Sequence, residues 1–170
     1  MNFLMIGLRV IHIFSAVAWV GGNFLLVLVV SRGLQSLGPE AGKFMGGLIG
    51  PGRMTQYLSI TGVLTALSGL WMYWLVSGHL DHGWLTSGSG VVLTVGAVAG
   101  ILAWLHGAFA LGPIARRMGE LSKQMGERPA PEQQAEMQSL RERQATNSVV
   151  SIIIMSVAVI GMSAAQYAWF

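Results

Sequence analysis

Residues 3–30 read FLMIGLRVIHIFSAVAWVGGNFLLVLVV and contain a single charged side chain, Arg9. An α-helix needs about 20 mostly apolar residues to cross the roughly 30 Å hydrocarbon core of a bilayer, and this run is long enough. It lacks the basic leading segment and the small-residue cleavage site of a signal peptide. The run is therefore expected to be a permanent transmembrane helix.

Three further stretches have the same character, at residues 56–76, 91–111 and 149–169. Over the whole chain of 170 residues, 53% are hydrophobic and only 10% are charged, which is too little polar surface to cover a soluble core of this size. The sequence predicts an all-α protein in which residues 1–170 form one domain. That domain is expected to be an antiparallel bundle of four transmembrane helices surrounded by lipid.

The basic residues predict how the helices are oriented. The first connection carries Arg32, Lys43 and Arg53, and the third carries Arg116, Arg117, Lys123, Arg128, Arg141 and Arg143. The second connection, residues 78–88, carries none. Because basic loops stay in the cytoplasm, the first and third connections are expected there and both termini outside, in a bacterial inner membrane.

The composition also excludes several functions. The net charge of +3 does not indicate nucleic-acid binding, because the basic residues are split between two loops and interleaved with glutamates; contact with anionic lipid explains them better. The chain has no cysteine, which excludes disulfides, thiolate-ligated iron–sulfur clusters and covalently attached haem. Any metal or haem would need His, Met or oxygen ligands.

Two connections are expected to be partly helical. Apolar residues at helical spacing predict a short interfacial helix within residues 34–48. The third connection predicts a basic helix over 114–127, a break at Pro129 and Pro131, and a second charged helix over 132–145. Together these two would form a cytoplasmic helical hairpin or a helix extension.

Small residues form stripes on two of the transmembrane helices. They are Gly96, Gly100, Ala103 and Gly107 in the third helix, and Gly62, Ala66 and Gly69 in the second. Small side chains let helices approach closely, so dispersion can hold them together. These stripes are expected to be the helix contacts.

The first helix carries a polar seam. Its members share one helix face, at Met5, Arg9, His12, Ala16, Trp19 and Asn23. An ionisable side chain inside a membrane is costly and indicates a partner, a cavity or a cofactor. One interpretation makes neutral His12 a ligand of haem iron or copper, with Arg9 beside a haem propionate and Trp19 on the cofactor-binding face.

The other interpretation of this seam is structural. His12 would hydrogen-bond another helix, at Thr61, Thr65 or Ser68, and Arg9 would reach the outer headgroups. Both interpretations stay open on the sequence.

His106, near the cytoplasmic end of the third helix, is the second candidate haem ligand, with Arg116 and Arg117 placed to meet the propionates. At 1.5 Å rise per residue, His12 lies about 12 Å and His106 about 24 Å from the outer surface. The ligands of one haem should lie at similar depth. Two sites, or one site and one structural histidine, are therefore expected.

The sequence offers further candidate ligands, namely two methionines and a group of residues in the outer loop. Met72 and Met162 lie at the depth of His12 and could complete a His/Met haem or a Cu(I) site. The outer loop offers two imidazoles and a carboxylate, at His79, Asp81 and His82. These could collect Cu(II) or Zn(II), although without a third fixed ligand such residues are usually ordinary loop residues.

The segment from His12 to Gly22, a histidine followed by Trp19 and a small pair, resembles the first helix of a bacterial membrane superfamily. That superfamily includes copper-resistance D (CopD) domains and HemJ-type protoporphyrinogen oxidases. The resemblance continues at residues 105–107 and 115–117, at Asn147 and at residues 162–167. It implies a four-helix unit in which His12 ligates haem b or lies on a copper route.

HemJ-type enzymes continue this helix into a Leu-Pro-Arg stretch and a second histidine, whereas this chain has residues 23–30 followed by Ser31 and Arg32. The resemblance therefore places the chain nearer the copper-resistance D side or in a sister group. Three functions stay open. They are a haem b electron-transfer protein or membrane oxidoreductase, a copper-handling permease, and an accessory subunit of a homo-oligomer or larger membrane complex.

Overall fold

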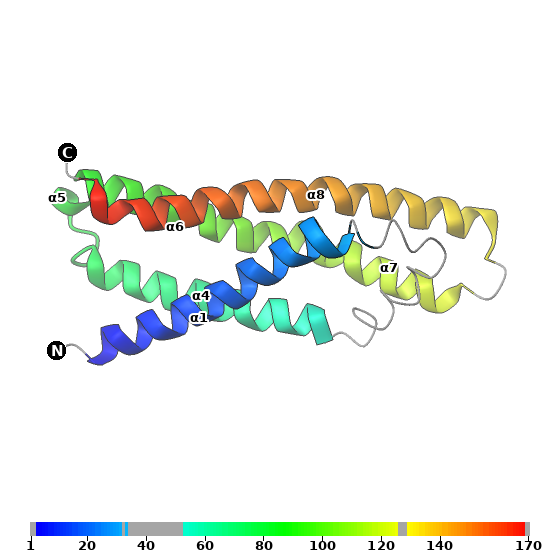
Figure 1. Ribbon diagram of the computed structural model, residues 1–170, viewed down its shortest axis with the longest axis horizontal. Helices are drawn as coiled ribbons and strands as arrows, with labels where there is room; N and C mark the ends of the chain where they lie inside the picture. The colour runs from blue at the N-terminus through cyan, green and yellow to red at the C-terminus, as the bar shows by residue number, and fades with distance from the viewer. Residues whose placement is uncertain (1–2, 32, 34–52, 126–128, 169–170) are drawn as a thin grey trace.

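The computed structural model describes residues 3–31, 33, 53–125 and 129–168. In chain order (Figure 1) the elements are α1 (Phe3–Phe24), η1 (Leu25–Val30), α4 (Arg53–Val76), α5 (His82–Leu85), α6 (Gly88–His106), η3 (Gly107–Leu111), α7 (Gly112–Gln124), α8 (Pro131–Ala164) and η4 (Ala165–Tyr167). The segments η1 and η3 are π-helical, and η4 is a 3₁₀ turn. All regular elements of these residues are helices, which confirms the all-α prediction.

Four helical stretches are long and apolar enough to cross a membrane; three contain a predicted span in full, and the fourth covers residues 149–167 of the predicted 149–169. They are Phe3–Val30, Arg53–Val76, Gly88–Gln124 and Pro131–Tyr167. Large apolar side chains point outward on all four, for example Phe14 at 75% exposure and Phe109 at 78%. Lipid can cover such faces without the cost of exposing them to water. The chain is a multi-pass membrane protein in contact with lipid.

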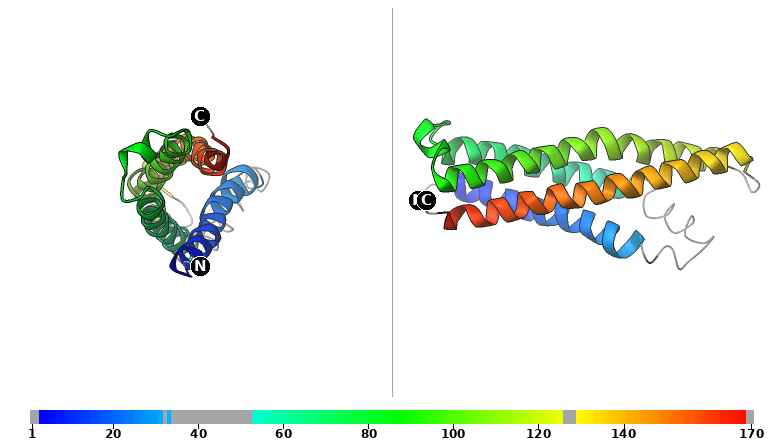
Figure 2. Two further views of the ribbon diagram at one scale, coloured as in Figure 1. Left: turned by 90° about the vertical axis from the view of Figure 1, so that its left-hand side faces the viewer. Right: turned by 90° about the horizontal axis from the view of Figure 1, so that it is seen from above.

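The four long helices surround a common centre in the order α1, α4, α6, α8 (Figure 2). The main contacts join α1 to α4 and α6 to α8, and α1 approaches α8 only near η1 (Figure 1). The helix α1 begins and η4 ends at the same end of the bundle, here named the terminal end. The opposite end is named the hairpin end.

One apolar cluster connects the two helix pairs. Its buried members are Trp19, Ala103 and Met155, with Val20, Phe24, Leu58, Trp104 and Ile154 packed around them. These side chains come from α1, α4, α6 and α8, so the four helices meet here. The cluster is named the Trp19 cluster. Trp19 lies seven residues beyond His12 along α1, which is about 10 Å toward the hairpin end.

At the hairpin end, α7 and the first half of α8 form a hydrophilic hairpin. Its buried core consists of Ile114, Leu121, Met137 and Leu140. Between Phe109 and Val149, none of the described residues is an exposed large hydrophobic residue. The predicted break is confirmed, because α8 begins at Pro131, but α8 then continues without interruption into the fourth span. The interfacial helix predicted within 34–48 lies outside the described residues.

Candidate functional site

The imidazole of His12 lies between α1 and α4 and is hydrogen-bonded to α4. Its Nδ1 is 3.0 Å from the carbonyl oxygen of Thr65 and 3.3 Å from Oγ of Ser68. The predicted contact with another helix is confirmed for these two residues. Thr61, the third candidate, instead donates its hydroxyl to the carbonyl of Tyr57.

These partners determine which ring nitrogen of His12 carries the proton. A carbonyl oxygen only accepts hydrogen bonds, and the Ser68 hydroxyl donates its hydrogen to the carbonyl of Leu64 at 2.5 Å. Nδ1 of His12 must therefore be the donor to both Thr65 and Ser68. In a neutral imidazole this leaves a lone pair on Nε2.

Nε2 of His12 is available to a ligand. Nothing among the described residues hydrogen-bonds it, and every fully buried side-chain nitrogen or oxygen of those residues has a partner. An atom without a partner must therefore be accessible. Nε2 is also the ring nitrogen farther from α4: an ideal Cβ on Gly69 would lie 3.7 Å from Nε2, 3.0 Å from Nδ1 and 2.7 Å from Cε1.

Gly69 makes room for this ring. A separation of 2.7 Å between a Cβ and Cε1 is shorter than real Cβ contacts, so a side chain at Gly69 would displace the imidazole. Thr65, Ser68 and Gly69 are spaced i, i+3 and i+4, so they present one surface of α4 to the ring. These three residues are named the His12 seat.

A second set of hydroxyl contacts keeps α1 and α4 in register next to the seat. The hydroxyl of Thr65 lies 3.0 Å from Oγ of Ser15, and Ser15 donates its own hydrogen to the carbonyl of Ile11 at 2.7 Å. Ser15 and Thr65 are both buried. Interhelical hydrogen bonds of this kind hold transmembrane helices together, so the seat belongs to a rigid interface.

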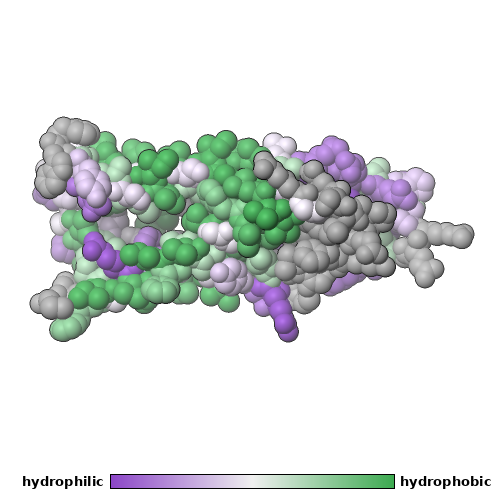
Figure 3. All heavy atoms as spheres, in the orientation of Figure 1, coloured by the Kyte–Doolittle hydropathy of each residue, from purple (hydrophilic) through white to green (hydrophobic). Residues whose placement is uncertain are grey.

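Arg9 lies one helical turn from His12 toward the terminal end, on the same face of α1. Its side chain is exposed, and no acidic group among the described residues pairs with it. At this end the surface is hollowed between the α1–α4 pair and the α6–α8 pair, as Figure 3 shows. The Trp19 cluster closes the bundle farther toward the hairpin end.

His106 occupies a different interface and uses both ring nitrogens. Nε2 lies 3.1 Å from Oδ1 of Asn147, and Nδ1 lies 2.8 Å from Oγ of Ser151. The amide of Asn147 is fixed because its Nδ2 donates to the carbonyl of Arg143. An amide oxygen only accepts, so Nε2 of His106 donates and, in the neutral ring, Nδ1 accepts from Ser151.

His106 therefore ties α6 to α8, and the structure does not bring it together with His12. This separation agrees with the depth argument from the sequence. A second haem on His106 would have to displace one of its two hydrogen bonds.

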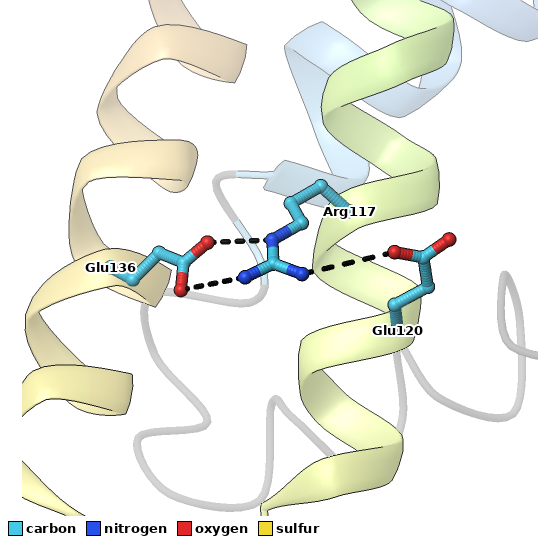
Figure 4. A network of polar contacts seen from close by, with 3 residues as sticks. All are labelled: Arg117, Glu120 and Glu136. Atoms are coloured by element: carbon cyan, nitrogen blue, oxygen red, sulfur yellow. Dashed lines mark hydrogen bonds and ion pairs between the residues drawn. The ribbon is translucent and has the colours of Figure 1, made fainter.

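Of the two arginines expected beside that second site, Arg117 is already paired. Its Nε and Nη2 bind the two carboxylate oxygens of Glu136 at 2.6 and 3.0 Å, and Glu120 lies 3.9 Å away (Figure 4). The pair links α7 to α8 within the hydrophilic hairpin. Arg116 is exposed. A propionate would compete with Glu136 for Arg117.

The two predicted methionine ligands have different surroundings. The methyl carbon of Met162 lies 3.3 Å from the Cβ position of Gly100, so this thioether packs in the α6–α8 interface rather than beside His12. Met72 is half-buried on α4, three residues beyond Gly69 toward the terminal end.

The outer-loop residues have structural contacts of their own. The carboxylate of Asp81 accepts the backbone N–H of Trp84 and caps α5, and the ring of His79 packs edge-on against Trp74. His82 is the first residue of α5. Within the residues that the structure describes, no three His, Cys, Asp or Glu side chains are grouped so that they could hold a metal ion.

Gly69 and Ser15 are the site residues that the sequence did not single out. Gly69 was expected only as part of a small-residue stripe. The signal that could have found it is its position directly after Ser68, one of the expected partners of His12.

Comparisons of the chain with protein-family models, with curated proteins and with solved structures give no match. The resemblance of residues 12–22 to the copper-resistance D and HemJ superfamily stays a prediction.

Proposed function

We propose that the protein is an integral membrane protein that binds haem b and transfers electrons. Nε2 of His12 would be the protein ligand to the iron. One observation carries this proposal: Nδ1–H donates to the Thr65 carbonyl, so the lone pair is on the accessible Nε2. Histidines that ligate metals almost always donate their other N–H to a carbonyl or carboxylate, which fixes the ring and raises its basicity.

Three features near His12 support this proposal. Gly69 seats the ring, and the hollow at the terminal end lies beside the α1–α4 pair (Figure 3). Arg9 supplies a positive charge without an acidic partner in the described chain, which suits a propionate. When bound, haem b supplies one-electron chemistry, and these residues bind and orient it.

The proposed orientation places the termini outside a bacterial inner membrane and the hydrophilic hairpin in the cytoplasm. Nine of the ten Lys and Arg residues support it, because they lie in the first and third connections. His12 is then in the outer half of the membrane, and electrons would be exchanged from that side.

The experiment is the optical spectrum and haem content of the full chain, purified in detergent from haem-replete cells. We expect a Soret band with split α and β bands in the wild type and its loss in His12→Ala. The matched control is His79→Ala, which removes an exposed loop histidine and should leave the spectrum unchanged. Wild-type haem content in His12→Ala would show that the ligand assignment is wrong.

The same purified protein also distinguishes between the two alternative functions. Copper bound at His12 in place of haem would support a copper-handling protein, because an imidazole lone pair suits copper as well as iron. If neither cofactor is present, the accessory-subunit function is the better interpretation.

A further inference from the structure

We infer that Ser68 is a positioning residue for His12, whose Oγ shares the Nδ1 proton with the Thr65 carbonyl and so sets the orientation and basicity of Nε2. The effect on a bound iron rests on the proposed function. The hydrogen bond itself belongs to the protein alone and can be tested without a cofactor.

The first step is the direction of the Ser68 hydroxyl. Ser68 is 5% exposed, so its hydrogen must find an acceptor inside the protein. The carbonyl of Leu64 lies 2.5 Å from Oγ and that of Thr65 lies 3.3 Å away, both on the same helix. A serine that bonds back to the preceding turn keeps its lone pairs free for another donor. The donor within reach is Nδ1 of His12, at 3.3 Å.

The second step is the geometry of the shared proton. Nδ1–H faces two acceptors, the Thr65 carbonyl at 3.0 Å and Ser68 Oγ at 3.3 Å. Two acceptors define the plane of the ring better than one. Gly69 has no side chain, which leaves room for the Cε1 edge of the ring. The His12 seat therefore holds the ring by two hydrogen bonds and leaves room for it at Gly69.

The third step is the consequence for Nε2. Acceptors on one imidazole nitrogen increase electron donation by the other, and a low-dielectric interior strengthens the effect. Loss of the Ser68 acceptor should therefore make Nε2 less basic. A less basic ligand stabilises oxidised iron less, so the reduction potential of a bound haem should rise.

The chain offers a closely matched pair of variants. Ser68→Ala removes a buried hydroxyl that touches the His12 imidazole. Thr61→Ala removes a half-buried hydroxyl from the same helix, one turn before Thr65, that bonds only the backbone carbonyls of Tyr57 and Leu58. Any effect of simply removing a hydroxyl from α4 should appear in both variants. Ser68→Thr keeps the hydroxyl and is the rescue variant.

The cofactor-free readout is the ring nitrogens of His12 in the full chain, labelled with ¹⁵N-histidine in detergent micelles. The His12 signals are those that disappear in His12→Ala. We expect a protonated Nδ1 and an unprotonated Nε2, with a shift of the Nδ1 signal in Ser68→Ala but not in Thr61→Ala. A proton on Nε2, or equal shifts in the two variants, would overturn the inference.

The second readout is the midpoint potential of the haem-loaded protein. We expect Ser68→Ala to retain haem and show a higher potential, Thr61→Ala to keep the wild-type value, and Ser68→Thr to return toward it. Equal potentials in Ser68→Ala and Thr61→Ala would contradict the role of Ser68. If the wild type binds no haem, the proposed function fails, and the nitrogen signals still decide the inference.

Discussion

Gly96 in α6 and Gly161 in α8 bring their helix backbones into direct contact. An ideal Cβ on Gly161 would lie 2.8 Å from Cα of Gly96, and one on Gly96 would lie 2.7 Å from the backbone nitrogen of Met162. Backbone atoms cannot move aside as a flexible side chain can. The close packing of α6 against α8 therefore requires glycine at both positions.

Gly161→Ala should destabilise the bundle by about 1–3 kcal/mol, because the added methyl group forces α6 and α8 apart. The free energy of unfolding in detergent is the measurement. Gly119→Ala is the control, since a Cβ on that α7 glycine meets none of the described residues within 4 Å. Equal stability of the two variants would contradict the close contact.

Gly69→Ala should lower haem affinity about 10- to 100-fold, the range for loss of support around a metal-binding histidine. The methyl group would displace the His12 ring from its seat. Titration of haem into the haem-free protein measures the affinity. Gly21→Ala is the control, because a Cβ at that α1 position meets no atom of the described chain within 4 Å. Unchanged affinity in both variants would mean that the seat does not matter for binding.

His106→Ala should lower stability by about 1–2 kcal/mol without changing haem content, because it leaves Asn147 and Ser151 without their shared partner. Thermal unfolding and the optical spectrum are measured on one preparation. Asn147→Ala should act in the same direction. Loss of the spectrum at wild-type stability would instead identify His106 as a ligand.

Arg117→Glu should loosen the hydrophilic hairpin, because it replaces a bidentate ion pair with repulsion from Glu120 and Glu136. Hydrogen exchange of α7 amides is the measurement, and the effect should shrink at high salt, since these side chains are exposed. Combining Arg117→Glu with Glu136→Arg should restore protection. If the double variant does not regain this protection, the ion pair does not order the hairpin.

Single cysteines test the proposed orientation, and the chain has none of its own. Thr86 and Ser122 are both exposed, at opposite ends of the bundle. Thr86→Cys should react with an impermeant reagent added outside intact cells, and Ser122→Cys only after the membrane is opened. The opposite labelling would reverse the orientation.

Hydropathy was sufficient to predict the four spans, because few soluble structures tolerate apolar runs of this length. It could not predict which helices pair, because lipid-facing and helix-facing positions are equally apolar. The stripe at Gly96 indicated a close approach but not that α8 would be the partner. For the third connection the sequence left a helical hairpin and a helix extension open, and both features are present: α7 and α8 form a hairpin, and α8 continues from Pro131 into the fourth span. The charged residues before Val149 mark where contact with lipid ends, not where the helix ends.

At the site, the sequence predicted the seam and two of the three residues of the His12 seat. It could not distinguish the two histidines, because the difference lies in which ring nitrogens are already bonded. His106 has Asn147 and Ser151 across the α6–α8 interface, whereas His12 has partners only at Nδ1 among the residues that the structure describes. Such contacts depend on helix rotation, which hydropathy does not encode.

The pairing of α1 with α4 and of α6 with α8 joins helices that are consecutive among the spans, and this bears on biogenesis. Each pair can form as soon as its second helix has left the insertion machinery, without waiting for the rest of the chain. Completion of the bundle is then the association of two preformed units at the Trp19 cluster. The hollow at the terminal end lies on the boundary between these two units, so the proposed haem would enter the protein after translation has ended.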